Sequence, residues 1–305
     1  MKRLAILLIS ACIGLPLSAQ KTIDILSLSG RYGTPQPYED TYTTEASESG
    51  SINSLTAGFN LSEKTMLAIN VNHFYFNVNG DPEIPDDIAN PIKINGFILR
   101  TGIIQKLGNG RALQVLIAPR LMSDFQNLDG NSFQMGGVIT YEKKFREDLT
   151  MSFGAMYNQE LFGPYLVPLV TLDWQLSEKW NISGMLPVTA RVVYKVNENL
   201  SAGFNHFGLI TTYYLGNENY AGDYMERQSI DLSLFLRQRI HKMVFIEGMV
   251  GRTFGRTYKQ YEGDQKVDFG IPLVTFGDDR TVKNVTFKDG LILTLKLVVN
   301  IPRPE

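Results

Sequence analysis

Eleven charged side chains recur at alternating positions in stretches that are apolar on their other face. They are the clearest candidates for functional residues in this sequence. They are Arg100, Arg120, Glu142, Asp173, Arg191, Lys195, Asp231, Arg237, Arg239, Glu247 and Lys296. Charged groups inside a membrane are costly unless they are paired or hydrated. Such a set would therefore either line a water channel or cross-link a closed interior. Seven of the eleven are basic, so an open lumen lined by them would weakly prefer anions.

Other residue types that carry chemistry form no motif. The three histidines, His73, His206 and His241, share no pattern, and the sequence has no nucleophile elbow, metalloprotease helix motif or histidine pair at metal spacing. We therefore expect no catalytic residue, metal site or cofactor, with a lipid-acting barrel enzyme as the alternative. Acidic loops at 36–49 and 79–91 offer oxygen ligands of the kind calcium prefers, but we interpret them as solvated loops.

Fourteen stretches of alternating apolar and polar residues would position the charged side chains. The predicted strands span residues 22–33, 50–61, 65–78, 92–107, 111–124, 132–145, 149–160, 165–175, 180–186, 189–196, 200–215, 227–240, 244–255 and 289–301. Five hinges are three residues long, at 62–64, 108–110, 146–148, 197–199 and 241–243. Short turns at one rim and long loops at the other are typical of transmembrane barrels. The pattern predicts an all-β, antiparallel up-and-down transmembrane β-barrel of about 14 strands, with 12 as the alternative.

The hinges also predict which residues pair across neighbouring strands. The expected outward pairs are Ile103 with Val115, Leu99 with Pro119, Phe59 with Leu67, Ala57 with Ile69, Tyr141 with Phe153, Tyr194 with Ala202, and Ile240 with Val244. The last register sets Arg237 across from Glu247 on the lumen face. Opposite charges in that position stabilise a sheet by about 0.2–1 kcal/mol.

The longer connections fall at the opposite rim. They lie at about 34–49, 79–91, 125–131, 216–226 and 256–288, so both termini lie with the short turns, which face the periplasm in bacterial barrels. Aromatic residues gather near strand ends, as in the interfacial girdles of membrane barrels. They are Trp174 and Trp180 at a short turn, and Phe74, Tyr75, Phe76, Tyr157, Phe162, Tyr165, Tyr213, Tyr214 and Phe254 toward the long loops.

Residues 1–19 have the form of a secretory signal peptide, in which a basic start precedes an apolar run and Ala19 precedes cleavage before Gln20. A lipoprotein signal at Cys12 is the alternative. Cys12 is the single cysteine, so the mature chain, one barrel domain over 20–305, would have no disulfide or cysteine metal site. No long apolar run follows the signal, which excludes membrane-spanning helices but not barrel strands.

Three short segments suggest a family resemblance. They are Phe162-Gly163-Pro164-Tyr165, then Leu172-Asp173-Trp174 before the Ser177-Glu178-Lys179-Trp180 turn, then Met185-Leu186-Pro187. With them, the chain resembles bacterial outer-membrane β-barrel proteins, and within these a single-domain barrel family of unknown function. The resemblance implies a barrel but transfers no catalytic or binding residue. One departure is the C-terminus, which ends in Pro304-Glu305 rather than the aromatic residue common in outer-membrane barrels.

These patterns predict a barrel in the outer membrane, with outer-membrane lipid and the barrel assembly machinery as partners. The composition, with 29 basic and 31 acidic residues and no basic patch, predicts no nucleic-acid partner. The predicted role is a passive pore or small-solute transporter. The alternatives are a structural or adhesive barrel whose long loops bind partners or lipopolysaccharide, and a soluble exported barrel that binds a small apolar ligand.

Overall fold

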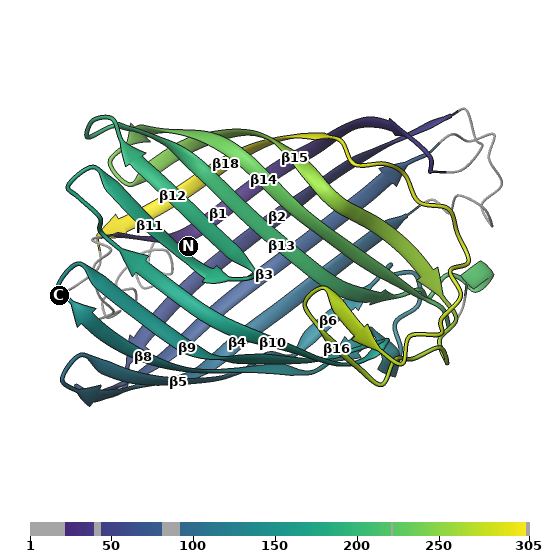
Figure 1. The fold of residues 1–305 in the computed structure, drawn as a ribbon, viewed down its shortest axis with the longest axis horizontal. Helices are drawn as coiled ribbons and strands as arrows, with labels where there is room; N and C mark the ends of the chain where they lie inside the picture. The colour runs from purple at the N-terminus through teal and green to yellow at the C-terminus, as the bar shows by residue number, and fades with distance from the viewer. Residues whose placement is uncertain (1–21, 40–43, 81–91, 221, 303–305) are drawn as a thin grey trace, which may run out of the picture.

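A closed antiparallel β-barrel accounts for nearly all of the described chain (Figure 1). The computed structural model describes residues 22–39, 44–80, 92–220 and 222–302. The expected signal peptide with Cys12, and nearly all of the acidic loop at 79–91, lie outside the described residues. The strands are β1 (Thr22–Pro37), β2 (Glu45–Asn60), β3 (Thr65–Asn79), β4 (Lys93–Gly108), β5 (Arg111–Ile117), β6 (Arg120–Ser123), β7 (Phe133–Gln134), β8 (Gly136–Arg146), β9 (Leu149–Glu160), β10 (Gly163–Trp174), β11 (Trp180–Leu186), β12 (Thr189–Lys195), β13 (Leu200–Tyr214), β14 (Tyr224–His241), β15 (Val244–Tyr261), β16 (Phe269–Ile271), β17 (Val274–Phe276) and β18 (Leu291–Pro302).

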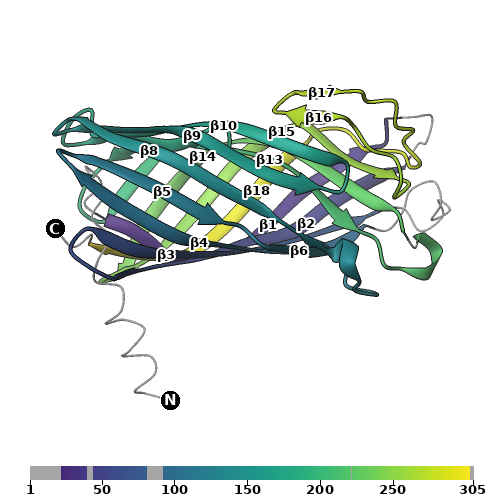
Figure 2. The same ribbon diagram turned by 90° about the horizontal axis from the view of Figure 1, so that it is seen from below.

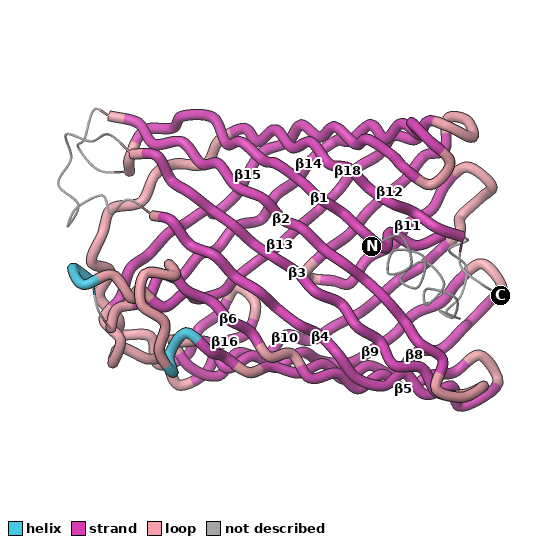
Figure 3. Tube along the Cα trace, turned by 180° about the vertical axis from the view of Figure 1, so that it is seen from behind, coloured by secondary structure: helices cyan, strands magenta, loops and turns pink. Residues whose placement is uncertain are grey.

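Fourteen strand positions make up the wall, because β5 continues into β6 and β7 into β8. Successive strands pair antiparallel around the ring, and β1 closes it by pairing with β18, with Thr22 opposite Pro302. Strands of the near and far walls cross at an angle in Figure 3, as the tilt required for barrel closure dictates. The predicted fold and strand number are confirmed.

The predicted strand register is also largely confirmed. The pairs Ile103–Val115, Phe59–Leu67, Ala57–Ile69, Tyr141–Phe153 and Tyr194–Ala202 all form, and Leu99 N donates to Pro119 O at 3.0 Å. The prediction for Ile240 is wrong, because His241 pairs with Val244 and a bulge lies between Arg239 and His241. The bulge absorbs the shift, so Arg237 still lies opposite Glu247.

The apolar face of the wall points outward. Leu291, Leu293, Leu295 and Leu297 are all exposed on β18, whereas the charged side chain of Glu247 on the neighbouring β15 is buried. A soluble barrel requires the inverse arrangement, with its apolar face inside. The exposed apolar face therefore argues against the soluble alternative. Within the described ranges, no helix has the length and apolar character needed to cross a bilayer.

The aromatic residues near the long loops do not form the predicted girdle. Six of the nine are buried inside the barrel: Phe74, Phe76, Phe162, Tyr165, Tyr213 and Tyr214. Tyr157 and Phe254 do point outward. The expectation fails because Phe74 and Phe76 share the strand face of Asn70 and Asn72, which is the lumen face. These rings fill the barrel instead of lining its surface.

The strands of the wall differ greatly in length. β11 and β12 have seven residues each, whereas β14 and β15 have eighteen. β16 and β17 form a small hairpin that lies outside the wall near the long-loop rim (Figure 2). We call residues 269–276 the outer hairpin. The first residue of β1 and the last of β18 both lie at the short-turn rim, as predicted.

Candidate functional site

A buried cluster of charged side chains occupies the long-loop half of the lumen. We call it the charged plug; its members are Arg31 on β1, Glu48 on β2, Arg227 and Asp231 on β14, and Arg256 and Tyr258 on β15. Arg31 Nη2 lies 2.7 Å from Glu48 Oε1, and Arg31 Nη1 lies 2.5 Å from Asp231 Oδ2. Since β18 and β15 separate β1 from β14 in the wall, the second of these contacts crosses the lumen.

Aromatic rings complete the charged plug. The Arg227 guanidinium lies 3.7 Å from the centre of the Phe76 ring. The Tyr258 hydroxyl donates to Glu48 Oε2 at 2.5 Å and accepts from Arg227 Nε at 3.0 Å. Glu48 and Arg227 have 0% solvent exposure. A desolvated cation over an aromatic face is stabilised by about 2 kcal/mol, so the rings contribute to keeping this arginine buried.

The charged plug carries an excess of positive charge, with three guanidinium groups against two carboxylates. Arg256 Nε and Nη1 have no hydrogen-bond partner among the described residues. Buried charges are tolerated only when paired, and removing one partner of such a pair is strongly destabilising. The closed arrangement therefore depends on both carboxylates, Glu48 and Asp231.

Apolar side chains surround the charged plug and fill the space that water would occupy. They are Tyr38, Ala46, Phe74, Phe76, Val78, Ile92, Ile94, Ile98, Met122, Tyr213, Leu215, Met225, Tyr258 and Phe287. They come from opposite walls of the barrel, so the long-loop half of the lumen is packed like a protein core. Because Glu48 and Arg227 have 0% exposure, solvent does not reach these two charged side chains.

The short-turn half of the lumen contains a polar cavity with a volume of about 190 Å³. Its lining residues are Ile104, Ala112, Gln114, Thr140, Glu142, Thr150, Ser152, Thr171, Leu172, Asp173 and Met185. Two predicted lumen residues, Glu142 and Asp173, are among them. Seven of the eleven lining residues carry a hydroxyl, amide or carboxylate group, and such groups can hydrogen-bond to water.

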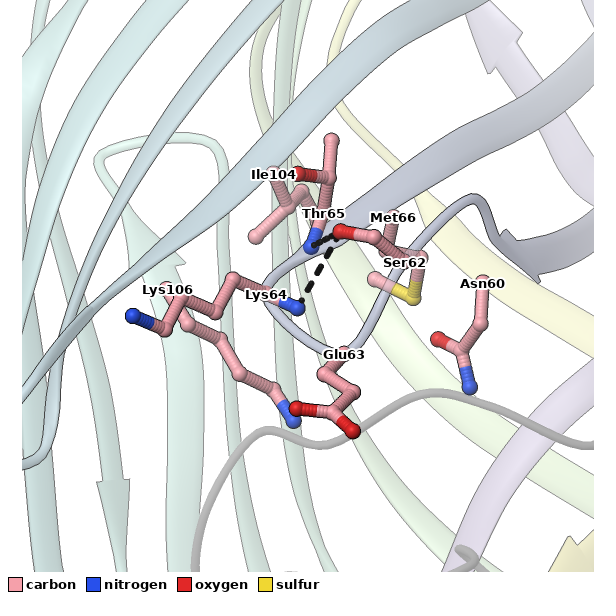
Figure 4. A pocket seen from close by; sticks show the side chains of 8 residues that line it. All are labelled: Asn60, Ser62, Glu63, Lys64, Thr65, Met66, Ile104 and Lys106. Carbon is pink, nitrogen blue, oxygen red and sulfur yellow. Dashed lines mark hydrogen bonds between the residues drawn. The ribbon is translucent and has the colours of Figure 1, made fainter.

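A second hollow lies at the β2–β3 turn and is too small for a ligand (Figure 4). Its volume of about 10 Å³ is at the lower limit of the space that one water molecule needs. Ser62 Oγ accepts hydrogen bonds there from the backbone N–H groups of Lys64 and Thr65. These contacts stabilise the turn, so we assign the hollow no binding role.

Four of the predicted lumen charges meet in a second cluster near the short-turn rim. We call it the lower ion cluster; it contains Arg191, Arg237, Glu247 and Lys296, together with Asp24. Glu247 forms an ion pair with Arg191 and lies 3.9 Å from both Arg237 and Lys296. Arg237 has a closer partner in Asp24, at 2.6 Å. The predicted Arg237–Glu247 contact is therefore present, but as the weaker of two.

The remaining predicted residues lie apart from both clusters. Arg120 is buried and its Nη1 lies 2.9 Å from Glu160 Oε1. Arg100 donates to Asn70 Oδ1 at 3.3 Å. Lys195 forms an exposed pair with Glu198, and Arg239 lies over the Phe245 ring at the short-turn rim. The exception is Asp231, the one predicted residue that belongs to the charged plug.

Residues 17–269 match a family described as a domain of unknown function, DUF6268. The match spans well over half of the chain. The chain belongs to this family. The predicted resemblance to a barrel family of unknown function is thereby confirmed, and no curated protein matches the chain.

Solved structures similar to this DUF6268 chain are outer-membrane barrels. The COG4313 outer membrane channel from Pseudomonas putida F1 matches at 10% identity and a TM-score of 0.47, covering 95% of this chain and 98% of that one. A Pseudomonas aeruginosa FadL homologue matches at 13% identity and a TM-score of 0.31, covering 91% and 76%. The translocator domain of autotransporter NalP from Neisseria meningitidis matches at 10% identity and a TM-score of 0.36, covering 98% and 94%. Similarity at this level carries no information about substrate or mechanism.

Sequence reasoning missed most of the charged plug in this DUF6268 chain. Glu48, Arg227 and Arg256 lie at or beyond the ends of the predicted strands, because β2, β14 and β15 extend further than their patterns indicate. Arg31 lies within a predicted strand, on the face of Ser27 and Ser29, so its alternation was a usable signal. Asp24 was hidden by a bulge between Asp24 and Leu26, which changes the face to which it belongs.

The connection after the outer hairpin is held by an ion pair whose pH dependence is testable. Hydrogen bonds from Arg280 lower the pKa of Asp278 to about 2, from 3.8. Because the folded pKa lies below the ordinary value, the pair stabilises fully above 3.8 and is lost as pH falls through the folded value. We expect the connection after the outer hairpin to resist pepsin above pH 3.8 and to become cleavable between pH 3.8 and about 2.

The control for this pH experiment is Asp278→Asn, which removes the titrating group. This variant should be cleaved at a similar rate across the same pH range. Equal, flat cleavage rates of wild type and variant would show that the ion pair does not hold the segment.

Proposed function

We propose that this chain is an outer-membrane barrel that lets small solutes cross, with the charged plug as its movable constriction. The exposed apolar face of β18 and its neighbours suits a bilayer, and the expected signal peptide would direct the chain out of the cytoplasm. The orientation in this proposal has the short turns and both termini in the periplasm. The role is non-enzymatic.

The division of the lumen into two unlike halves carries this proposal. A polar cavity occupies the short-turn half, and unexposed charged and aromatic side chains close the long-loop half. A barrel that serves only as an anchor requires neither a hydrated compartment nor a plug with unpaired guanidinium N–H groups. Rearrangement breaks fewer hydrogen bonds in an incompletely bonded cluster than in a fully bonded one. The free-energy cost of rearrangement is therefore smaller, which favours a constriction that opens.

The charges along the path favour anions once the constriction opens. The charged plug and the lower ion cluster each contain three cationic side chains against two carboxylates, and Arg100 adds a further positive charge on the wall. Glu142 and Asp173 in the polar cavity offset two of these three excess positive charges, so the path keeps a net positive charge. Fixed positive charge in a narrow, low-dielectric passage raises the local concentration of anions. The lumen charges predicted from the sequence would thus set selectivity, with Glu247 reducing it.

The test is single-channel recording of the purified barrel in planar bilayers under a salt gradient. We expect a mostly closed protein with brief openings, and reversal potentials on the anion side. Reversal on the cation side would refute the assigned selectivity. Complete absence of current, from wild type and from variants that break the plug, would favour the adhesive or structural alternative, provided the barrel shows the heat-dependent gel migration of a folded protein.

A further inference from the structure

The hydrogen-bonded wall is interrupted between the short β11–β12 hairpin and the long-loop rim. β10 pairs with β11 only from Val170 to Trp174, although β10 begins at Gly163. β13 pairs with β12 only as far as Phe207, although β13 continues to Tyr214. Among the described residues, the parts of β10 and β13 nearer the long-loop rim therefore do not continue their ladders with β11 and β12. On this edge each has a single parallel bridge instead, Tyr165 with Gly270 of β16 and Tyr214 with Ser123 of β6.

The interruption has defined edges, and we call it the side window. Its lower edge is the β11–β12 turn, where Gly208 N donates to Val188 O at 2.8 Å. Its sides are the parts of β10 and β13 nearer the long-loop rim. At the end nearer the long-loop rim, β10 and β13 are joined where Leu161 N donates to Thr212 Oγ1 at 2.8 Å. The side window is thus a closed outline within the wall rather than a frayed sheet edge.

The outer hairpin covers the side window from outside the barrel. Figures 1 and 2 show it lying over the region between β10 and β13. It attaches along the β10 edge only: Tyr165 pairs with Gly270, and Val267 N donates to Phe162 O at 2.8 Å. Within the described ranges, β17 has no strand partner other than β16. The β13 side of the cover therefore has no backbone ladder to hold it.

The tip of the outer hairpin has the chemistry of a lipid contact. Leu273 is 77% exposed, and Val274 and Phe276 are also exposed. Leu273 adopts a positive φ of 70° after Pro272, a turn position where Gly or Asn is favoured. In water, Leu273 would carry two free-energy costs: first the strained backbone, and second the exposure of a large apolar side chain. Contact with acyl chains removes the second penalty.

The inner side of the side window is also apolar. Val167 and Leu169 of β10 are buried there, with Ile210 of β13 and Val188 of the turn packed against the same cluster. Met185 packs against this cluster and also lines the polar cavity. Packed side chains of this cluster therefore extend from Tyr165, beside Gly270 of the outer hairpin, to Met185 at the edge of the polar cavity.

We propose that the side window admits a small apolar or amphipathic molecule between the bilayer and the lumen, with the outer hairpin as its cover. This inference names a substrate class and a lateral route for the transport function proposed above, and rests on it. The side chains of Val167, Leu169, Val188 and Ile210 are all apolar, which favours an apolar solute over an ionic one on this route. The charged plug blocks the axial route at the same height, so a lateral route lets an apolar molecule bypass it.

The first test measures the depth of the hairpin tip by tryptophan quenching. In a Trp174→Phe, Trp180→Phe background, Leu273→Trp is reconstituted into vesicles with brominated acyl chains. Leu295→Trp, on the exposed face of β18, is the lipid control, and Leu128→Trp, on an exposed loop at the long-loop rim, is the solvent control. We expect quenching equal to that of Leu295→Trp. Quenching as weak as that of Leu128→Trp would overturn the proposal.

The second test measures the route itself by cysteine labelling, in a Cys12→Ser background. We expect Ile210→Cys to react with a lipid-soluble maleimide and not with a charged, membrane-impermeant one. Ala112→Cys, in the polar cavity, should show the reverse preference. Adding Gly270→Val should speed the Ile210→Cys reaction several-fold, because a side chain at Gly270 would meet the Tyr165 ring at 2.8 Å and lift the cover.

These readouts do not depend on conductance. Failure of the lipid-soluble reagent at Ile210→Cys, with and without Gly270→Val, would overturn the lateral route and leave the axial channel proposal intact. A protein that is silent in bilayers but labelled at Ile210→Cys would instead overturn the axial channel and leave the side window in place.

Discussion

Glu48→Gln should convert a mostly closed barrel into a mostly open one. Glu48 pairs with Arg31 and Arg227 and accepts from Tyr258, with no solvent exposure. Glutamine keeps the shape and removes the charge, which leaves three guanidinium groups against Asp231 alone. Breaking a buried pair costs about 3 kcal/mol, and this cost falls on the closed state. At 1.4 kcal/mol per factor of ten, the open population should rise about 100-fold.

The measurement is open probability in planar bilayers, with heat-dependent gel migration to confirm folding. Glu142→Gln is the matched control, because Glu142 lines the polar cavity outside the plug, and it should gate like wild type. A folded Glu48→Gln protein with wild-type open probability would show that the charged plug is not the constriction.

Glu160→Gln should destabilise the barrel more than any other single loss of charge outside the plug. Glu160 Oε1 accepts from Arg120, and Oε2 accepts from Thr212 N at 2.9 Å and from Thr212 Oγ1 at 2.8 Å. This carboxylate joins β9 to β6 and β13, neither of which pairs with β9 in the sheet. The substitution leaves a buried, uncompensated Arg120, which should lower the free energy of unfolding by about 3–5 kcal/mol.

Denaturant titration in lipid vesicles measures this loss. The double variant Arg120→Met, Glu160→Leu should recover most of it, since replacing both partners by apolar groups is often neutral. Glu198→Gln, at an exposed pair on the short-turn rim, should cause no measurable change. Equal stability of Glu160→Gln and Glu198→Gln would contradict the structural role of the buried pair.

The link at Glu160 also shows what sequence reasoning could not supply. Arg120 was predicted to face the lumen from its alternation, but its partner lies forty positions away on a strand that is not adjacent. Alternation reports the face of a side chain and nothing about its height in the barrel or its partner across the lumen. Height depends on strand tilt and on where each strand starts.

The aromatic residues near the long loops show the same limit. Phe76 and Tyr157 both lie toward the long-loop ends of their strands, yet one is buried against Arg227 and the other faces outward. A girdle and a packed lumen use the same residue types at the same depth. Only the face of each ring distinguishes them, and near strand ends a bulge or an added residue changes that face.

The sequence alone determined the strands, their number, most of the register and the division of each strand into an apolar and a polar face, while the structure decided that the apolar face points outward. The sequence did so because side chains alternate with a period of two and short turns leave little freedom in pairing. The tertiary structure decided which lumen charges meet, that the long-loop half is closed, and that the wall is interrupted above β11 and β12. Those features arise from closure of the ring, from the bulge after Asp24 and from unequal strand lengths, which bring together residues whose contacts no local pattern encodes.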